Sequence, residues 1–297
     1  DPAVKTPSNI DSMPDAEKAV VNNAVSAAAG TTATGLDAIG GKEATNVTSS
    51  EVNTAKEQLS KTSGVTINTG DSVTLYVQPY LAITVTGAEV ASGATEGSTT
   101  TTSLSLNITP MIKKVASTAE NAGAIKTEGE GKNAVQIGDA EKVPNVNTPV
   151  TIKLALPTGF AQDGDKLSIK HTKENGSIEY YTGTVTKEGT DPNTKTYVTF
   201  TTNGFSPFTI YAASQSAASV NGVIYPSFQA AVDAAQNNDE ITLLKGDAVS
   251  ATMTGSSKTI KVKAGSGVTT PINVTVNGEM KVLNDANGVT FTYTRPS

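Results

Sequence analysis

The segment from Val150 to Ala212 consists of short runs in which apolar and polar side chains alternate. A period of two places one set of side chains on each face of a β-strand, so that one face packs and the other meets solvent. Turn residues separate the runs, and Asn175-Gly176 is a strong hairpin signal because both residues tolerate positive φ. This pattern predicts an antiparallel β-domain. Its packed face is expected to contain Val150, Ile152, Leu154, Leu156, Leu167, Ile169, Val198, Phe200, Phe208 and Ile210.

The alternation extends upstream to Val65, with an interruption at Pro79. We expect polar loops at 91–102 and 117–132, and a short strand around Val135 and Ile137. Together these segments give about eight or nine strands between residues 65 and 213, which is typical of an Ig-like antiparallel β-sandwich. The apolar positions of the upstream strands are Val73, Leu75, Val77, Leu81, Ile83, Val85, Leu104, Leu106 and Ile108.

Residues 1–64 contain two predicted short helices. The first follows Pro14, has acidic residues in its first turn and ends near Gly30. The second opens at Thr48 with Glu51 three residues on, which is the capping-box spacing, and would bury Val52, Ala55 and Leu59. Helices with such thin apolar stripes bury little area, so we expect them to pack on the sandwich rather than to form a domain.

Residues 219–297 form a separate predicted module after a small, polar linker at 212–218. A strand at 223–225 precedes a helix capped by Ser227, and short strands separated by glycine-rich turns follow. Such short, evenly spaced strands indicate a small α+β fold or a β-solenoid-like coil. The predicted class is therefore mainly β: N-terminal helices at 1–64, the sandwich at 65–213, and this module.

Composition excludes several functions. The net charge is −6 and Arg295 is the only arginine, which argues against nucleic-acid binding. The absence of cysteine excludes disulfides and thiolate metal sites. No apolar run approaches the ~18 residues of a membrane span. The polar start at Asp1 is typical of a mature or trimmed chain, and no signal peptide is visible.

The C-terminal module and the last strand of the sandwich carry a resemblance. The segment from Val223 to Leu244 resembles a module repeated in exported, cell-surface proteins of Gram-positive bacteria, in which a strand and a helix lead into short β-coils. Asn238 stands where that pattern usually has glycine. The segment from Gly204 to Ile210 is similar to the last strand of Ig-like modules in such proteins. The resemblance implies location and modularity, and it transfers no catalytic residue.

Few residues suggest chemistry. His171, the only histidine, is interpreted as a packed strand-end residue rather than a general base. The sequence Asp163-Gly164-Asp165 resembles half of a calcium loop but is better explained as a β-turn, although a composite calcium site stays open. The acids of the C-terminal module fall in turns and helix ends, where local roles explain them; they are Asp233, Asp239, Glu240, Asp247, Glu279 and Asp285.

One covalent possibility is a Lys-Asn isopeptide bond of the kind found in bacterial adhesins. Lys153 and Lys170 lie on predicted strands and Asn203 follows one, but both lysines occupy the polar positions. We therefore interpret them as solvated charges. We predict no catalytic, cofactor-binding or metal-binding residue, and we expect that the acids and the lone imidazole do not gather at one place.

The predicted function is a non-catalytic surface, adhesion or structural spacer module of a secreted or wall-associated protein. Its partner would be an extracellular protein or a glycan, with neighbouring modules of the same protein possible. The alternative is a carbohydrate-binding accessory domain, which needs exposed aromatic side chains on one face. Aromatics make up only 5% of the chain, and tryptophan is absent. The candidates for such a face are Tyr76, Tyr180, Tyr181, Tyr197 and Tyr211. A deep pocket lined by two acids or by His171 would instead favour an enzyme.

Overall fold

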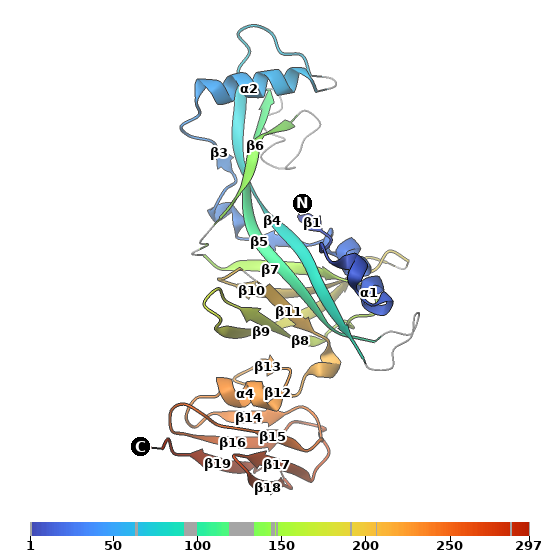
Figure 1. The fold of residues 1–297 in the computed structure, drawn as a ribbon, viewed down its shortest axis with the longest axis vertical. Helices are drawn as coiled ribbons and strands as arrows, with labels where there is room; N and C mark the ends of the chain where they lie inside the picture. Colours follow the sequence, from blue (N-terminus) through green and yellow to red (C-terminus); the bar gives the residue numbers. More distant parts are fainter. Residues whose placement is uncertain are drawn as a thin grey trace.

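Strands dominate the computed structural model, which confirms the predicted mainly-β class. It describes residues 2–62, 65–91, 100–118, 134–143, 146, 148–190, 192–205, 207–285 and 287–296. Three bodies with separate apolar clusters follow one another along the longest axis (Figure 1). We call them the upper body, around α2 (Ser49–Ser60), the central body, and the C-terminal body, which begins at β12 (Ala218–Val220).

The central and upper bodies share one eleven-stranded sheet, with the order β1-β4-β5-β11-β8-β9-β10-β7-β2, β3 beside β4 and β6 beside β5. Its strands are β1 (Ala3–Lys5), β2 (Thr32–Thr34), β3 (Lys42–Glu43), β4 (Val73–Val90), β5 (Thr101–Thr118), β6 (Ala134–Lys142), β7 (Val150–Leu156), β8 (Lys166–Thr172), β9 (Ile178–Glu188), β10 (Lys195–Thr202) and β11 (Pro207–Tyr211). An Ig-like sandwich has two separate sheets. Here β11 pairs with both β5 and β8, so the strands follow one hydrogen-bonded path.

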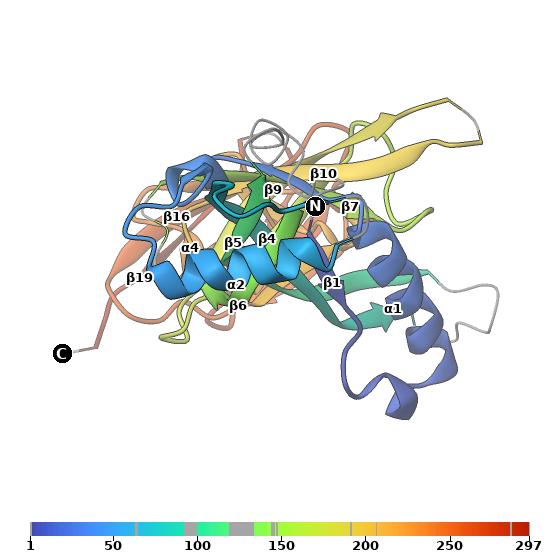
Figure 2. The ribbon, with the colours of Figure 1, turned by 90° about the horizontal axis from the view of Figure 1, so that it is seen from above.

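Helix α1 (Asp15–Ala28) contacts β4 and β7, which lie far apart in the strand order. Its buried residues are Val20, Val21, Ala24 and Ala28, and they belong to the same apolar cluster as the strand residues of the central body. The predicted start is confirmed, with Pro14 at the N-cap and acids at Asp15 and Glu17. Figure 2 shows α1 beside β1 and the lower part of β4. The helix therefore packs on the central body and contributes to its apolar cluster.

The upper body is built on the first half of β4 and the last half of β5. Helix α2 lies across these strands and β6 (Figure 2). The predicted capping box is present: Glu51 N donates to Thr48 Oγ1 at 3.2 Å, and Thr48 N donates to Glu51 Oε2 at 2.8 Å. Ala55 and Leu59 are fully buried. They pack against an apolar cluster from the three strands, formed by Leu75, Ala116 and Ile137.

Strand β4 continues through Pro79, so the interruption predicted there is wrong. On its outer edge β3 pairs as far as Val77, whereas β1 begins to pair at Ala82. Proline is tolerated at an unpaired strand edge because it has no N–H to donate. The predicted strand at Val135 and Ile137 is confirmed within β6. Of the two predicted loops, Thr101, Thr102, Ser117 and Thr118 belong to β5, and 92–99 and 119–133 lie outside the described residues.

The C-terminal body contains one step of a β-coil. Strand β14 (Glu240–Leu243) pairs in parallel with β16 (Lys258–Ala264), and β15 (Val249–Ala251) pairs in parallel with β17 (Ile272–Val276). Antiparallel β18 (Glu279–Leu283) and β19 (Val289–Tyr293) complete the two sheets. At the other end lie β12, β13 (Val223–Tyr225) and α4 (Phe228–Ala234), and Ser227 caps α4 as predicted by accepting from Ala230 N. Asn238 adopts φ +69°, as its glycine-like position requires.

The C-terminal body is bonded directly to β8 and β9. Ser168 Oγ donates to the carbonyl of Ile224 at 2.7 Å. Ile224 N donates to Thr182 Oγ1 at 2.9 Å, and the Thr182 hydroxyl donates to Gly222 O at 3.3 Å. The predicted linker at 212–218 is thus short and partly structured, with a 3-10 turn at Ala213–Gln215. Within the described part of the chain, no helix is long and apolar enough to cross a bilayer.

Candidate functional site

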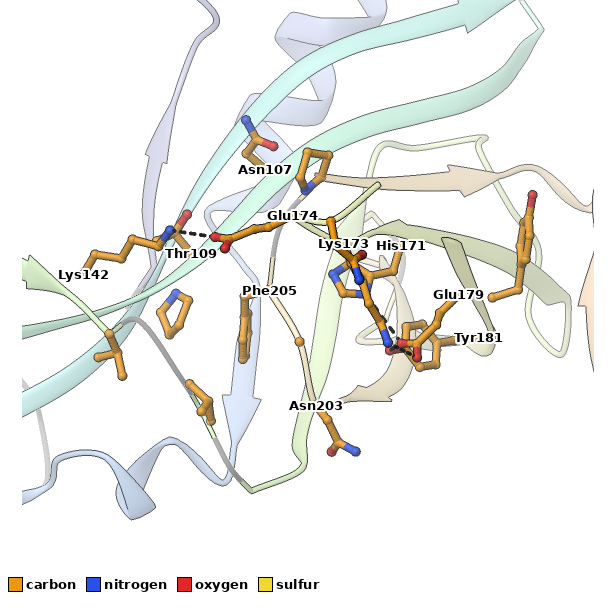
Figure 3. Close-up of a pocket in the computed structure, with 17 residues that line it drawn as sticks. Asn107, Thr109, Lys142, His171, Lys173, Glu174, Glu179, Tyr181, Asn203 and Phe205 are labelled. Carbon is orange, nitrogen blue, oxygen red and sulfur yellow. Dashed lines mark hydrogen bonds and ion pairs between the residues drawn. The ribbon is translucent and has the colours of Figure 1, made fainter. Parts of the chain in front are cut away.

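A groove of about 1100 Å³ lies beside the central sheet, where four segments meet. They are the middle of β5, the end of β6, the β8–β9 turn and the connection from β10 to β11 (Figure 3). These segments come together because β11 pairs with both β5 and β8. Its lining includes Asn107, Thr109, Asn203, Phe205 and two ion pairs.

The charged side chains of the groove are paired with one another. Lys142 Nζ lies 3.6 Å from Glu174 Oε1, and this pair joins the end of β6 to the β8–β9 turn. Lys173 Nζ donates to Glu179 Oε1. Tyr181 OH donates to the other oxygen of Glu179, Oε2, at 2.8 Å. The hydrogen bond from Lys173 is the main reason that the pKa of Glu179 lies below its usual value.

His171 is buried behind this cluster, with 1% of its surface exposed. Its ring stacks on Phe208 at a centroid distance of 4.7 Å and on Tyr181 at 6.2 Å. A Cβ on Gly204 would lie 2.7 Å from His171 Cε1, so the glycine backbone covers the imidazole edge closely. Burial lowers the pKa of His171 despite the opposing effect of Glu179.

The expectation that the acids and the lone imidazole do not gather is wrong here, because His171 Nδ1 lies 3.8 Å from Glu179 Oε2. Strand pairing is the physical cause. His171 on β8 stands directly opposite Glu179 on β9, across a hairpin whose turn contains Asn175 and Gly176. The hairpin was predicted, but a two-residue Asn175-Gly176 turn would pair Thr172 with Glu179, so the turn signal alone gives a register one residue away from the observed one.

The Asp163-Gly164-Asp165 segment is a turn. Asp163 Oδ1 accepts from Lys187 N at 2.9 Å, and Asp165 Oδ2 accepts from Gln162 N at 2.8 Å. Gly164 has φ +83°, which favours glycine. Among the described residues, no group of three or more His, Cys, Asp or Glu side chains could hold a metal ion.

The C-terminal acids have local partners where the structure shows them. Asp233 accepts from Gln229, Asp239 from Gln236 N, and Asp285 from Asn287 N, each at 2.8 Å. Glu240 pairs with Lys261 and Lys263, and Glu279 with Lys281. None of these acids, nor Asp247, lines the groove.

The isopeptide candidates do not all line the groove. Lys153 Nζ pairs with Glu188 at 2.6 Å and lies 4.4 Å from the centre of the Tyr197 ring. Asn203 lines the groove, whereas Lys153 and Lys170 do not.

The five candidate tyrosines do not form one aromatic face. Tyr180 and Tyr181 line the groove, while Tyr76 is buried in the upper body and donates to Gly41 O. Burial raises the pKa of Tyr180 to about 12, so its hydroxyl stays protonated. A further aromatic side chain that lines the groove is Phe205, which the sequence placed only at the start of a closing strand.

Comparisons with known proteins give no match. No protein-family model matches the chain, and neither a curated protein nor a solved structure matches it.

Proposed function

We propose that this chain is a non-catalytic spacer and surface module of a secreted or wall-associated protein, and that it holds its bodies in a fixed line. The observation that carries this proposal is the way the bodies are joined. Strands β4 and β5 run without a break from the upper to the central body, and the C-terminal body is bonded to β8 and β9 (Figure 1). Neither junction is a flexible linker.

His171, Glu174 and Glu179 line the groove, which is the feature expected of an enzyme, but their contacts favour a role in binding rather than turnover. A general base needs a lone pair that can reach a substrate proton. The His171 ring is stacked between Phe208 and Tyr181, and its carbon Cε1 faces Gly204. The two oxygens of Glu179 accept from Lys173 and Tyr181. These groups are arranged to hold one another.

An extracellular location is supported by the outer strand faces and by the resemblance of the segment from Val223 to Leu244 to cell-surface modules. Hydroxyl-bearing residues keep the exposed strand faces polar without charge, for example Thr151 and Thr201, whose hydroxyls bond across β7 and β10 at 2.8 Å. The partner would be an extracellular protein or a glycan.

Distances between spin labels test the spacer role, and the absence of native cysteine makes labelling specific. Exposed positions are available in each body, and we choose Thr54→Cys, Thr186→Cys and Ser250→Cys. Double electron–electron resonance on pairs of these sites should give narrow, single distance distributions. The reference is Ser250→Cys with Thr290→Cys, both within the C-terminal body. A broad or multiple distribution for any pair between bodies, beside a narrow reference, would refute the proposal.

A further inference from the structure

The groove carries no net charge from its paired residues. Lys142 and Lys173 contribute two positive charges, and Glu174 and Glu179 contribute two negative charges, each within a pair. A strongly charged ligand would have to break one of these pairs or leave its own charge without a counterion. The electrostatics therefore favour a neutral ligand.

Between the two ion pairs lies Phe205 (Figure 3). It is partly buried, and part of its side chain packs against the apolar cluster of the central body. A ring that is already held by packing loses little conformational entropy when a ligand stacks on it. The groove thus has a rigid apolar platform with polar groups around it.

Amide and hydroxyl groups also line the groove. Asn107 and Thr109 extend from β5, and Asn203 precedes Phe205 on the β10–β11 connection. Asn107 and Asn203 are exposed. Each amide offers donors and an acceptor, so it can bond hydroxyl groups that act in either sense. Apolar surface combined with a few such groups is the usual composition of a small-ligand site.

We propose that the groove binds a short segment of a neutral oligosaccharide. A neutral sugar ring has an apolar C–H face, which would stack on Phe205, and a rim of hydroxyls, which would bond the Asn107 and Asn203 amides and the Thr109 hydroxyl. This inference rests on the proposed non-catalytic role and names the class of partner for it. An extended peptide would be held chiefly by main-chain bonds along a strand edge, whereas this groove presents side chains from a turn and a connection.

His171 provides the readout. It is the only histidine and it lines the groove, so its ring protons give one set of resonances that reports occupation. The probes are neutral tetrasaccharides of glucose, mannose, galactose and N-acetylglucosamine, with tetragalacturonate as the acidic probe and a neutral tetrapeptide as the peptide probe. At least one neutral tetrasaccharide should shift the His171 resonances in a saturable way, and the other two probes should not.

Two variants locate the binding. Phe205→Ala should weaken the affinity about tenfold or more because it removes the stacking platform. Phe205 also packs against the core, so Asn107→Ala, at an exposed position, gives a second test that leaves folding intact and should weaken affinity several-fold. Tyr197→Ala is the matched control, since Tyr197 is an aromatic residue outside the groove.

The proposal is overturned if no neutral tetrasaccharide binds at millimolar concentration, or if only tetragalacturonate or the peptide binds. Equal loss of affinity in Tyr197→Ala and Phe205→Ala would also overturn it. These outcomes are separate from the fate of the spacer role. Failure of saccharide binding leaves the spin-label distances unchanged, whereas a flexible junction broadens those distances and leaves the His171 shifts in place.

Discussion

Acidification from about pH 7.5 to about pH 5 should destabilise the central body through His171. Burial lowers the pKa of this imidazole, with Glu179 opposing the shift and Lys173 adding to it. In the unfolded chain the pKa is about 6.5. Between that pH and the lower native pKa, the His171 imidazole is protonated in the unfolded state and neutral in the native state. The stabilisation is therefore complete above about pH 6.5 and is lost as the pH falls towards the native pKa.

The size of the effect follows from linkage. One proton bound only by the unfolded state changes the free energy of unfolding by at most about 1.4 kcal/mol per pH unit. Between about pH 6.5 and pH 5 the loss is therefore at most about 2 kcal/mol. Glu179 contributes in a separate, more acidic range, because its pKa lies below the usual 4.5 of a glutamate.

Two measurements check this prediction. Because the chain has one histidine, NMR resonances of the imidazole titrate without overlap. Urea unfolding followed by circular dichroism at several pH values gives the stability. The comparison variant is His171→Phe, which keeps a ring between Phe208 and Tyr181 but cannot take up a proton. Its stability should change less with pH over this range.

The reasoning would be refuted by an imidazole that titrates at or above pH 6.5 in the folded protein. Parallel loss of stability in the wild type and in His171→Phe would refute it as well.

Three further predictions concern packing and the junction. Gly183→Ala should lower the free energy of unfolding by about 1–3 kcal/mol because the added Cβ would overlap Val198 Cγ2. A double-mutant cycle with Val198→Ala should show a favourable coupling energy, and additive effects of the two substitutions would contradict the clash. Thr182→Val should lower the free energy of unfolding by about 1–2 kcal/mol because it leaves the Ile224 N–H without its acceptor. It should also broaden the distance distribution between spin labels at Thr186→Cys and Ser250→Cys, and an unchanged distribution would show that this bond does not fix the junction. Leu59→Ala should lower the stability of the upper body by about 2–5 kcal/mol, measured by hydrogen exchange of α2, and should leave exchange in the C-terminal body unchanged. Loss of protection in both bodies would contradict their separate cores.

The elements that the sequence predicted well depend on neighbours a few residues apart. The capping box of Thr48 and Glu51, the Ser227 cap and the left-handed Asn238 are each determined within about four residues. The strand core followed for the same reason, because alternation is a local property. Strands β12 and β15 were missed because three residues show no period and neither run is wholly apolar, whereas the equally short β13 was found from three consecutive apolar residues after a turn.

The groove could not be predicted because its lining residues lie far apart in the sequence. Asn107, Lys142, Glu174 and Phe205 come from four segments. They meet because β11 lies between β5 and β8, and strand order of this kind is set by tertiary packing. Pro79 shows the same limit, since only the two short strands on either side of it explain why β4 continues.

The continuous β4–β5 hairpin also determines how the molecule comes apart. Its upper half is covered by α2, so melting of that helix exposes Leu75 and Ala116 and leaves the hairpin to unzip from its far end towards the centre. Asn107 and Thr109 lie midway along β5. A ligand bound to these two residues would stop the separation of β4 from β5 at that point. Only the upper body would then unfold.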